Sequence, residues 1–279
     1  MPAYLRPTSQ SEALAALAQG RLTVLAGGTD YYPARVGRPI DDDILDISAI
    51  PGLRGIRDGG DHWRIGATTT WSELAEAALP PCFDGLKAAA HEVGGVQIQN
   101  AGTLGGNLCN ASPAADGVPP LLALDARIEI ADAAGSKNMA LADFILGNRK
   151  TALQPGQLLT AVLVPKPAHA ARSHFLKLGA REYLVVSIAM VAATLELEAG
   201  QVRAARIAVG ACSPVAQRLP LAEAVLAGKP CDAHLGGSVR AEHMAALAPI
   251  DDVRASGEYR MEAALTLVRR VLNHLGAHA

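Results

Sequence analysis

The segment from residue 100 to residue 116 constrains this chain more than any other, because it combines a mobile backbone with several polar side chains. Its three glycines would allow the backbone to wrap closely around a flat ligand. Thr103, Asn107 and Ser112 offer hydrogen bonds, and Asp116 offers a carboxylate that can accept one from a ribityl or ribose hydroxyl. A turn that serves only the fold seldom needs all of these residue types together, so the segment predicts a binding site.

A second glycine turn, residues 26–30, follows an expected strand at residues 22–25. Adjacent glycines allow positive φ, and successive N–H groups in such a turn form a concave nest that fits a pyrophosphate. The turn has neither the G-x-G-x-x-G of a helix-opening loop nor the Lys-Ser/Thr pair of a P-loop, so a phosphate would bind loop amides. Alone, these five residues fit an ordinary strand-ending turn equally well. With residues 100–116 they favour a dinucleotide with a diphosphate bridge and a polar ring edge.

Local signals predict an α+β chain. Capping boxes of Ser9 with Glu12 and of Thr70 with Glu73 open two helices, which we expect to end at residues 20 and 79. A change of composition near residues 166–170 indicates a boundary between two domains. The other expected elements are strands at 22–25, 44–47 and 63–66, a helix at 87–92, an antiparallel hairpin at 187–198 and 202–210, and a helix at 259–275.

Composition and charge exclude several classes of protein. The net charge of −2 gives no basic excess to neutralise a nucleic-acid backbone. No apolar run approaches the roughly 20 residues that span a bilayer, and the N-terminus lacks the layout of a signal peptide. The four cysteines are isolated from one another, which predicts neither a zinc site nor an iron–sulfur cluster. We therefore expect a soluble cytoplasmic protein with reduced thiols and no metal.

Several motifs together resemble the FAD-binding medium subunits of the xanthine dehydrogenase and carbon monoxide dehydrogenase family, the molybdenum hydroxylases. The resemblance covers essentially the whole chain and implies the flavin-binding fold shared with vanillyl-alcohol oxidase. Two α/β subdomains, about residues 1–58 and 59–167, would clasp the FAD, and residues 168–279 would form a C-terminal domain of antiparallel strands and helices. The motifs are residues 26–30, 65–70, 102–107 and 176–181, and residues 258–260 with Arg269 and Arg270.

The resemblance also assigns the cofactor contacts. It places the pyrophosphate on residues 26–30 and those just past them, the flavin and diphosphate along residues 103–107, and a cofactor hydroxyl on Asp116. It brings Leu159 and Lys177 close to the isoalloxazine ring; without it, Lys177 would be a surface lysine. No catalytic residue is expected, and attachment of FAD should be non-covalent. The cofactor-binding residues are Ala26, Gly27, Gly28, Thr29, Asp30, Tyr31, Thr103, Leu104, Gly105, Gly106, Asn107, Asp116, Leu159 and Lys177.

By the same resemblance, the chain would work as one subunit of a larger assembly. It would accept electrons from a [2Fe–2S] small subunit and pass them to an external acceptor, while a molybdopterin large subunit hydroxylates the substrate. The assembly would be a dimer of heterotrimers. One alternative is a self-sufficient flavin-dependent reductase or oxidase of the same fold. Another is a scaffold subunit that has lost its flavin, against which the intact glycine clusters argue.

The chain departs from the family pattern in a few places. Gln99 stands where many relatives carry a basic residue, and Val93 stands where some carry an aromatic residue. The cysteines that some members use for a further iron–sulfur cluster are absent. Tyr31 and Tyr32 fit contact with the cofactor and packing equally well, and the role of Tyr183 near the flavin stays open.

Overall fold

The computed structural model describes residues 2–182 and 184–278, so Tyr183 lies outside the described residues. The chain is a mixed helix-and-sheet protein, as its sequence predicts. The strands are β1 (Tyr4–Leu5), β2 (Thr23–Leu25), β3 (Ile44–Asp46), β4 (Ile56–Asp58), β5 (His62–Gly66), β6 (Arg127–Asp132), β7 (Gly135–Ala140), β8 (Ile145–Gly147), β9 (Lys150–Thr151), β10 (Leu158–Pro165), β11 (Ala170–Leu178), β12 (Ala189–Glu198), β13 (Gln201–Gly210) and β14 (Gln217–Arg218). The α-helices are α1 (Gln10–Gln19), α2 (Trp71–Glu76), α3 (Asp84–Glu92), α4 (Val96–Ala101), α5 (Leu104–Asn110), α6 (Val118–Ala123), α7 (Leu141–Phe144), α8 (Pro220–Ala224) and α9 (Gly257–Ala277), and the short 3₁₀ turns are η1 (Pro33–Arg35), η2 (Pro51–Leu53), η3 (Pro81–Phe83), η4 (Leu235–Ser238) and η5 (Ala241–Met244).

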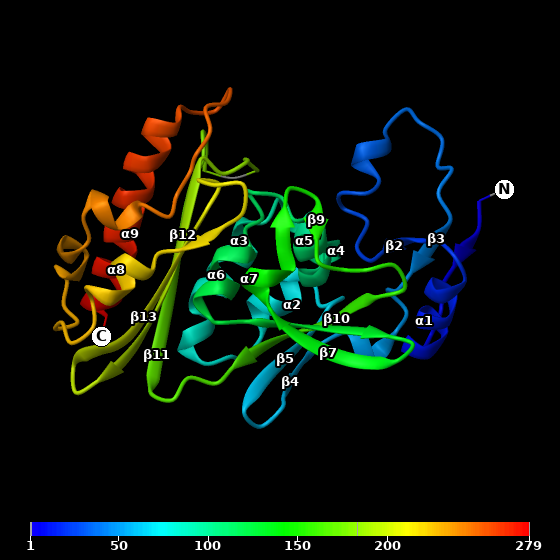
Figure 1. Ribbon diagram of the computed structural model, residues 1–279, viewed down its shortest axis with the longest axis horizontal. Coiled ribbons are helices and arrows are strands. Elements are labelled where there is room, and N and C mark those ends of the chain that lie inside the picture. Colours follow the sequence, from blue (N-terminus) through cyan, green and yellow to red (C-terminus); the bar gives the residue numbers. More distant parts are fainter. Residues whose placement is uncertain (1, 183, 279) are drawn as a thin grey trace.

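The N-terminal part is a small parallel sheet of strand order β1-β3-β2, covered by α1 (Figure 1). The capping box of Ser9 and Glu12 opens α1 as predicted, and the apolar face of the helix packs on the buried strand β3. Strand β2 forms where expected, but Val24 is 41% exposed and only Leu25 of the strand is buried. The glycine turn that follows Leu25 is partly exposed, at residues 26–30.

A five-stranded antiparallel sheet of order β4-β5-β10-β6-β7 forms the middle of the molecule. Figure 1 shows helices α2, α3, α5 and α6 on one side of this sheet. The buried strand β10 lies at its centre, and its apolar side chains join the helices in one hydrophobic core. The second predicted capping box, Thr70 with Glu73, opens α2, which ends at Glu76 and not at Leu79. Strand β4 pairs with β5 in this sheet.

The C-terminal part is an antiparallel sheet of order β11-β12-β13-β14. The predicted hairpin forms, and its turn at Ala199 and Gly200 has two successive positive φ values, 51° and 76°. Side chains of β12 alternate between the two faces of the sheet: Val191 packs toward α9, while Met190 and Ala192 pack toward α3 and α6. The sheet is thus buried on both faces and joins the middle of the molecule to α9 (Figure 1).

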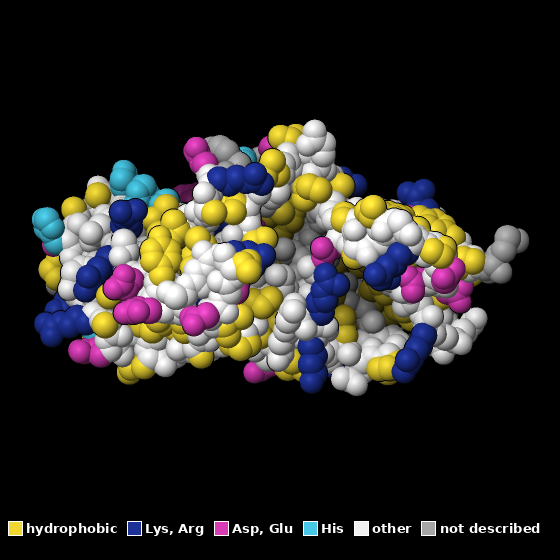
Figure 2. Space-filling model, turned by 90° about the horizontal axis from the view of Figure 1, so that it is seen from above, with side chains coloured by type: hydrophobic (Ala, Val, Ile, Leu, Met, Phe, Trp, Pro, Cys, Tyr) yellow, Lys and Arg dark blue, Asp and Glu magenta, His cyan; other side chains and the backbone are white. Residues whose placement is uncertain are grey.

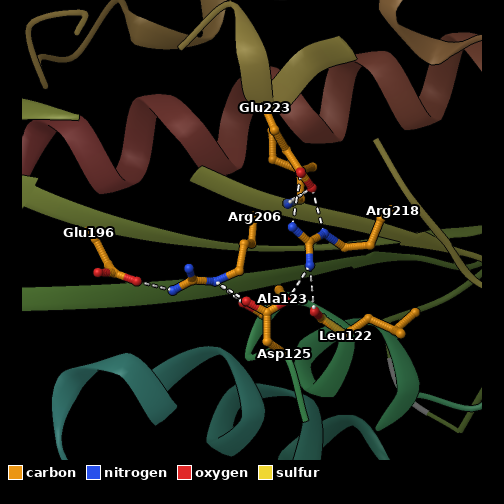
Figure 3. Close-up of polar contacts among 8 residues, drawn as sticks. Leu122, Ala123, Asp125, Glu196, Arg206, Arg218 and Glu223 are labelled. Atoms are coloured by element: carbon orange, nitrogen blue, oxygen red, sulfur yellow. Dashed lines mark hydrogen bonds and ion pairs between the residues drawn. The ribbon is translucent and has the colours of Figure 1, made fainter. Parts of the chain in front are cut away.

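Two arginines of the C-terminal sheet bind the carboxyl end of α6 (Figure 3). Arg206 donates to the carbonyl of Ala123 at 3.1 Å, and Arg218 donates to the carbonyl of Leu122 at 3.1 Å. Both also pair with Asp125, at 3.3 and 2.6 Å. Cations near the last carbonyls of a helix satisfy exposed acceptors and suit the helix dipole, so these contacts fix α6 against the sheet. The remaining ion pairs of this cluster join Arg206 to Glu196 and Arg218 to Glu223.

Two further features bear on the sequence-based expectations. Residues 104–110, whose glycines suggested a turn that wraps around a ligand, form the helix α5, and a short helix α4 precedes it. The long C-terminal helix forms as predicted and is two residues longer at each end. Among the helices of the described residues, none has the length and apolar character that a bilayer crossing requires.

Candidate functional site

A cleft with a volume of about 520 Å³ lies between the N-terminal sheet and the helices α4 and α5. Figure 2 shows the hollow on the face seen from above, between the N-terminal part and the middle of the molecule. The cleft brings together eleven of the fourteen predicted cofactor residues: Ala26, Gly27, Gly28, Thr29, Asp30, Tyr31, Thr103, Gly105, Gly106, Asn107 and Leu159.

The turn after β2 offers a row of unused backbone donors to this cleft. No described residue accepts a hydrogen bond from the backbone amides of residues 27–31. Gly28 has a φ of +70°, a conformation that favours glycine, and a Cβ there would lie 2.7 Å from the ring of Tyr32. A Cβ on Gly27 would collide with the carbonyl of Ala101. The glycines therefore shape a turn whose amides stay free to bind an anion.

The second glycine cluster works differently from the expectation. Thr103 caps α5 by accepting from the amide of Gly106, and the amides of Leu104 and Gly105 donate to the carbonyls of Thr69 and Ala67. The first amides of α5 are thus already paired, so this segment is not a second anion nest. Neither Gly105 nor Gly106 has positive φ.

Close packing explains two of the three glycines in this cluster. A Cβ on Gly105 would approach the backbone of Ala67 to 2.7 Å, and one on Gly102 would approach the carbonyl of Ile98 to 2.8 Å. Gly106, in contrast, is exposed at the cleft surface, and a Cβ there would meet only the hydroxyl of Thr103. Leu104 is buried in the central core and lies outside the cleft lining.

Asn107 carries an unsatisfied polar atom in the cleft wall. Its side-chain oxygen Oδ1 is buried and has no hydrogen-bond partner among the described residues. A buried polar group without a partner is destabilising by about 1 to 3 kcal/mol. Because Asn107 belongs to the cleft lining, a ligand or a water molecule at this wall would complete its hydrogen bonding.

Apolar side chains form much of the remaining wall. Val93 and Leu159 line the cleft, so the position of the missing aromatic faces the site as a smaller aliphatic side chain. Gln99 does not line the cleft, and its side-chain amide donates to the carbonyl of His91 at 2.9 Å. The site therefore suits an elongated molecule with flat apolar parts and an anionic group at the glycine turn.

The two adjacent tyrosines have separate roles. Tyr31 lines the cleft, donates to Asp42 at 2.8 Å, and has the guanidinium of Arg35 3.7 Å from the centre of its ring. Burial and the bond to Asp42 raise the pKa of the Tyr31 hydroxyl. Tyr32 stands edge-on to Tyr31 and packs over Gly28, outside the cleft lining. Contact with a ligand thus fits Tyr31, and packing fits Tyr32.

Asp116 and Lys177 lie against each other and do not line the cleft. Lys177 Nζ is 2.9 Å from Asp116 Oδ1, and the two side chains are 5% and 12% exposed. Lys177 also donates to the carbonyl of Glu92 at 3.2 Å. Burial raises the pKa of Asp116 to about 6, while Lys177 opposes that rise. Lys177 is therefore not a surface lysine: it joins β11 to the segment that precedes α6.

Sequence reasoning missed several residues of the cleft wall. Trp71 directly follows the motif at residues 65–70, and Ile98 lies just before the cluster at residues 100–116, but both are apolar residues that give no signal of a binding site. Arg149 follows Gly147 and Asn148, which mark a turn but not a site. The missed lining residues include Trp71, Ile98, Arg149, Leu153, Gln157 and Leu158. No group of His, Cys, Asp or Glu among the described residues is arranged to hold a metal ion.

Two family models match this chain: the FAD binding domain in molybdopterin dehydrogenase over residues 1–167, and the CO dehydrogenase flavoprotein C-terminal domain over residues 174–275. The putative xanthine dehydrogenase FAD-binding subunit of Escherichia coli (strain K12) is 31% identical over 283 residues, which are 99% of this chain and 96% of that relative. The carbon monoxide dehydrogenase medium chain of Hydrogenophaga pseudoflava is 30% identical, with 97% and 95% covered. The structure of reconstituted CO dehydrogenase from Oligotropha carboxidovorans matches with a TM-score of 0.90 and 28% identity, over 100% of this chain and 99% of that one.

Proposed function

This chain belongs to the family of FAD-binding medium subunits of molybdenum hydroxylases, and from that premise we propose that it passes electrons from a [2Fe–2S] subunit to an external acceptor by way of bound FAD. The observation that supports this most is the cleft itself. It combines a row of free backbone amides at residues 27–31 with an unpartnered amide oxygen on Asn107.

The residues of the cleft fit FAD. The free amides after β2 would bind the diphosphate, because neighbouring N–H groups at a glycine turn suit an anion. The hydroxyl-rich part of the cofactor would satisfy Asn107, and the aliphatic wall around Val93 and Leu159 would pack on a flat ring. Bound FAD supplies the electron transfer, while this chain supplies binding, orientation and tuning.

Asp116 and Lys177 belong to the proposed site on different grounds. Both stand at the junction between the middle of the molecule and the C-terminal sheet, and each neutralises the other. Direct contact with the cofactor would require FAD to extend past the lining residues and to share this ion pair. We therefore propose them as residues at the edge of the site.

The proposed architecture is the vanillyl-alcohol-oxidase type. Residues 1–58 and 59–167 would clasp the cofactor, and residues 168–279 would form the C-terminal domain. The position of the cleft supports this division, because its lining comes from both sides of the first boundary, from Gly28 on one side to Leu159 on the other.

The proposed partners are a small [2Fe–2S] subunit and a large molybdopterin subunit, in a dimer of heterotrimers. Relatives are named as medium chains or medium subunits, which describes them as one part of a complex.

A self-sufficient flavin reductase would need an acid or base beside the ring. The charged residues that line the cleft in the described part of the chain are Asp30, Arg35 and Arg149. Asp30 belongs to the turn proposed for the diphosphate, and Arg35 already pairs with Asp42.

Co-expression tests this function. The chain, tagged at one end, is produced together with the reading frames beside its gene, and the purified material is analysed for FAD, iron and molybdenum. We expect all three in fixed ratio, and reduction of the flavin by the substrate of the complex only when the iron–sulfur subunit is present. A tagged chain that carries FAD, binds no partner and turns over alone would favour the self-sufficient enzyme. A partner-bound chain without FAD would favour the scaffold.

A further inference from the structure

We propose that Arg149 faces the pyrimidine edge of the bound flavin and sets its reduction potential. This inference rests on the proposed function, and it assigns a role to a residue that lies in neither glycine cluster. Arg149 lies in the turn between β8 and β9 and lines the cleft.

The backbone of Arg149 is held in an unfavourable conformation. Its φ is +55°, in the left-handed region that favours glycine, and its amide donates to the carbonyl of Ala111 at 3.2 Å. Residues held there are destabilised by of order 1 to 3 kcal/mol and cluster at functional sites. Among the described non-glycine residues with positive φ, only Arg149 lines the cleft. A glycine would fit this turn with less strain, which makes the Arg149 side chain a candidate for a functional role.

Among the described residues that line the cleft, Arg149 is the only cationic one whose side chain forms no ion pair. Arg35 pairs with Asp42 at 2.6 Å and stacks on Tyr31. Arg149, in contrast, is an exposed residue of the cleft lining, and its side chain makes no ion pair or hydrogen bond with any described residue. It is therefore available to bind an anionic group of the ligand.

The place of Arg149 relative to helix α5 indicates which part of the ligand its guanidinium would meet. Gly27 packs against Ala101, just before the helix begins, whereas Arg149 bonds to Ala111, just after it ends. The seven residues of α5 separate the two points by about 10 Å at 1.5 Å per residue. The diphosphate would have its donors at the first point and the backbone of Arg149 lies at the second, so the Arg149 side chain would meet an end of the cofactor rather than the diphosphate.

Of the two ends of FAD, only the flavin changes its charge on reduction, so only there would a cation alter the reduction potential. Adenine is neutral in both redox states. The pyrimidine edge of the flavin gains negative charge on reduction, so a cation beside it binds the reduced cofactor more tightly than the oxidised one. The aliphatic wall of Val93 and Leu159 offers a surface for the ring in the same cleft.

Spectroelectrochemical titration of the purified holoprotein tests the proposal with Arg149→Met. We expect the preference for reduced over oxidised FAD to fall three- to tenfold, which lowers the two-electron potential by about 15 to 30 mV. Arg149→Lys keeps a cation and should recover most of the shift. Arg149→Gly removes the cation and relieves the backbone, so it should show the same shift as Arg149→Met with a melting temperature at or above that of the wild type.

Two comparisons separate this role from others. Lys150→Met removes an exposed positive charge from the next residue, which does not line the cleft, and should leave the potential unchanged. In Lys177→Met, which removes a buried cation outside the cleft lining, the reduction potential is measured in the same titration for comparison. A potential in Arg149→Met within 5 mV of the wild type would overturn the proposal, as would an equal shift in Lys150→Met.

The FAD content of each variant keeps the two proposals apart. Wild-type protein that binds no FAD would contradict the proposed function itself. Wild-type protein with FAD, together with an Arg149→Met variant that binds FAD less tightly but with an unchanged potential, would contradict only the inference. In that case Arg149 would contact another part of the cofactor.

Discussion

Replacement of Lys177 by methionine removes the cation from the buried ion pair with Asp116. The pair joins strand β11 to the segment before α6, and its charged atoms are 2.9 Å apart. Methionine keeps an unbranched apolar stem, so packing changes little and the loss is mainly electrostatic. The variant thus measures how strongly this contact holds the C-terminal sheet to the cofactor-binding part.

The magnitude follows from the distance and the burial. At 2.9 Å and an effective dielectric near 20, the attraction is about 6 kcal/mol before desolvation. Removal of one partner from a buried pair usually destabilises a protein by about 3 to 5 kcal/mol. Asp116 can avoid part of this loss by taking up a proton, because burial already raises its pKa to about 6. Without Lys177, which lowers that pKa, the value rises further.

The sign of the pH dependence follows from the raised pKa. A carboxyl with a higher pKa in the folded chain stabilises the fold below its unfolded value, 3.8 for Asp116, and loses this contribution as the pH rises through the folded value, about 6. At pH 8 the ionised carboxylate needs Lys177, and we expect Lys177→Met to lower the free energy of unfolding by about 3 kcal/mol. At pH 5 Asp116 is largely protonated in both proteins, and we expect a loss below about 1 kcal/mol.

Urea unfolding at pH 5 and pH 8, followed by tryptophan fluorescence and circular dichroism, measures this difference. Asp116→Asn and the double variant complete the cycle, and the double variant should be less destabilised at pH 8 than the sum of the two single variants. Equal losses of unfolding free energy at the two pH values, or additive losses in the two single variants, would contradict this prediction.

Three further predictions concern the cleft and the C-terminal helix. Gly28→Ala should lose FAD and lower the melting temperature by several degrees, because the turn needs positive φ and the ring of Tyr32 fills the space. Gly106→Val should also lose FAD, but with the melting temperature little changed. Equal melting temperatures in the two variants would contradict this. Asn107→Ala should weaken FAD binding at least tenfold, measured by equilibrium dialysis. It should not destabilise the FAD-free chain, measured by melting curves, because Oδ1 of Asn107 has no hydrogen-bond partner among the described residues. A large loss of stability of the FAD-free chain would contradict this prediction. Burial and the neighbouring His274 lower the pKa of His174 to about 4, so its neutral ring stabilises the fold above the unfolded value of 6.5 and this contribution is lost as the pH falls toward 4. His174→Gln should therefore flatten the fall in stability over that range, and an unchanged pH profile would count against it.

Local signals in the sequence predicted the elements that depend on local chemistry. The two capping boxes, Ser9 with Glu12 and Thr70 with Glu73, form with both of their hydrogen bonds. The terminal helix forms because an apolar face repeats along it and Ser256 caps it. The hairpin turn at Ala199 and Gly200 also follows from two adjacent residues. In each case the residues that determine the structure lie within one or two turns of chain.

The features that the sequence did not predict depend on contacts between segments that are distant in the sequence. The glycines of α5 suggested a loop, but Gly105 is small because α5 packs against the backbone of Ala67, a neighbour that the sequence does not reveal. Sixty-one positions separate Asp116 from Lys177, and their ion pair depends on how α6 and β11 meet. Arg149 reaches the cleft through a hairpin whose place is fixed by a hydrogen bond to Ala111. Such pairings depend on the tertiary structure.

Binding of FAD is tested by the identity and the amount of the nucleotide that the purified protein carries. Purified wild-type protein is denatured by heat, and the released chromophore is separated by chromatography and quantified against the chain. We predict one FAD per chain, released into solution and without FMN, because the cleft holds donors for a diphosphate and no covalent link is expected. Protein without flavin, flavin that stays with the precipitated chain, or FMN in place of FAD would contradict it.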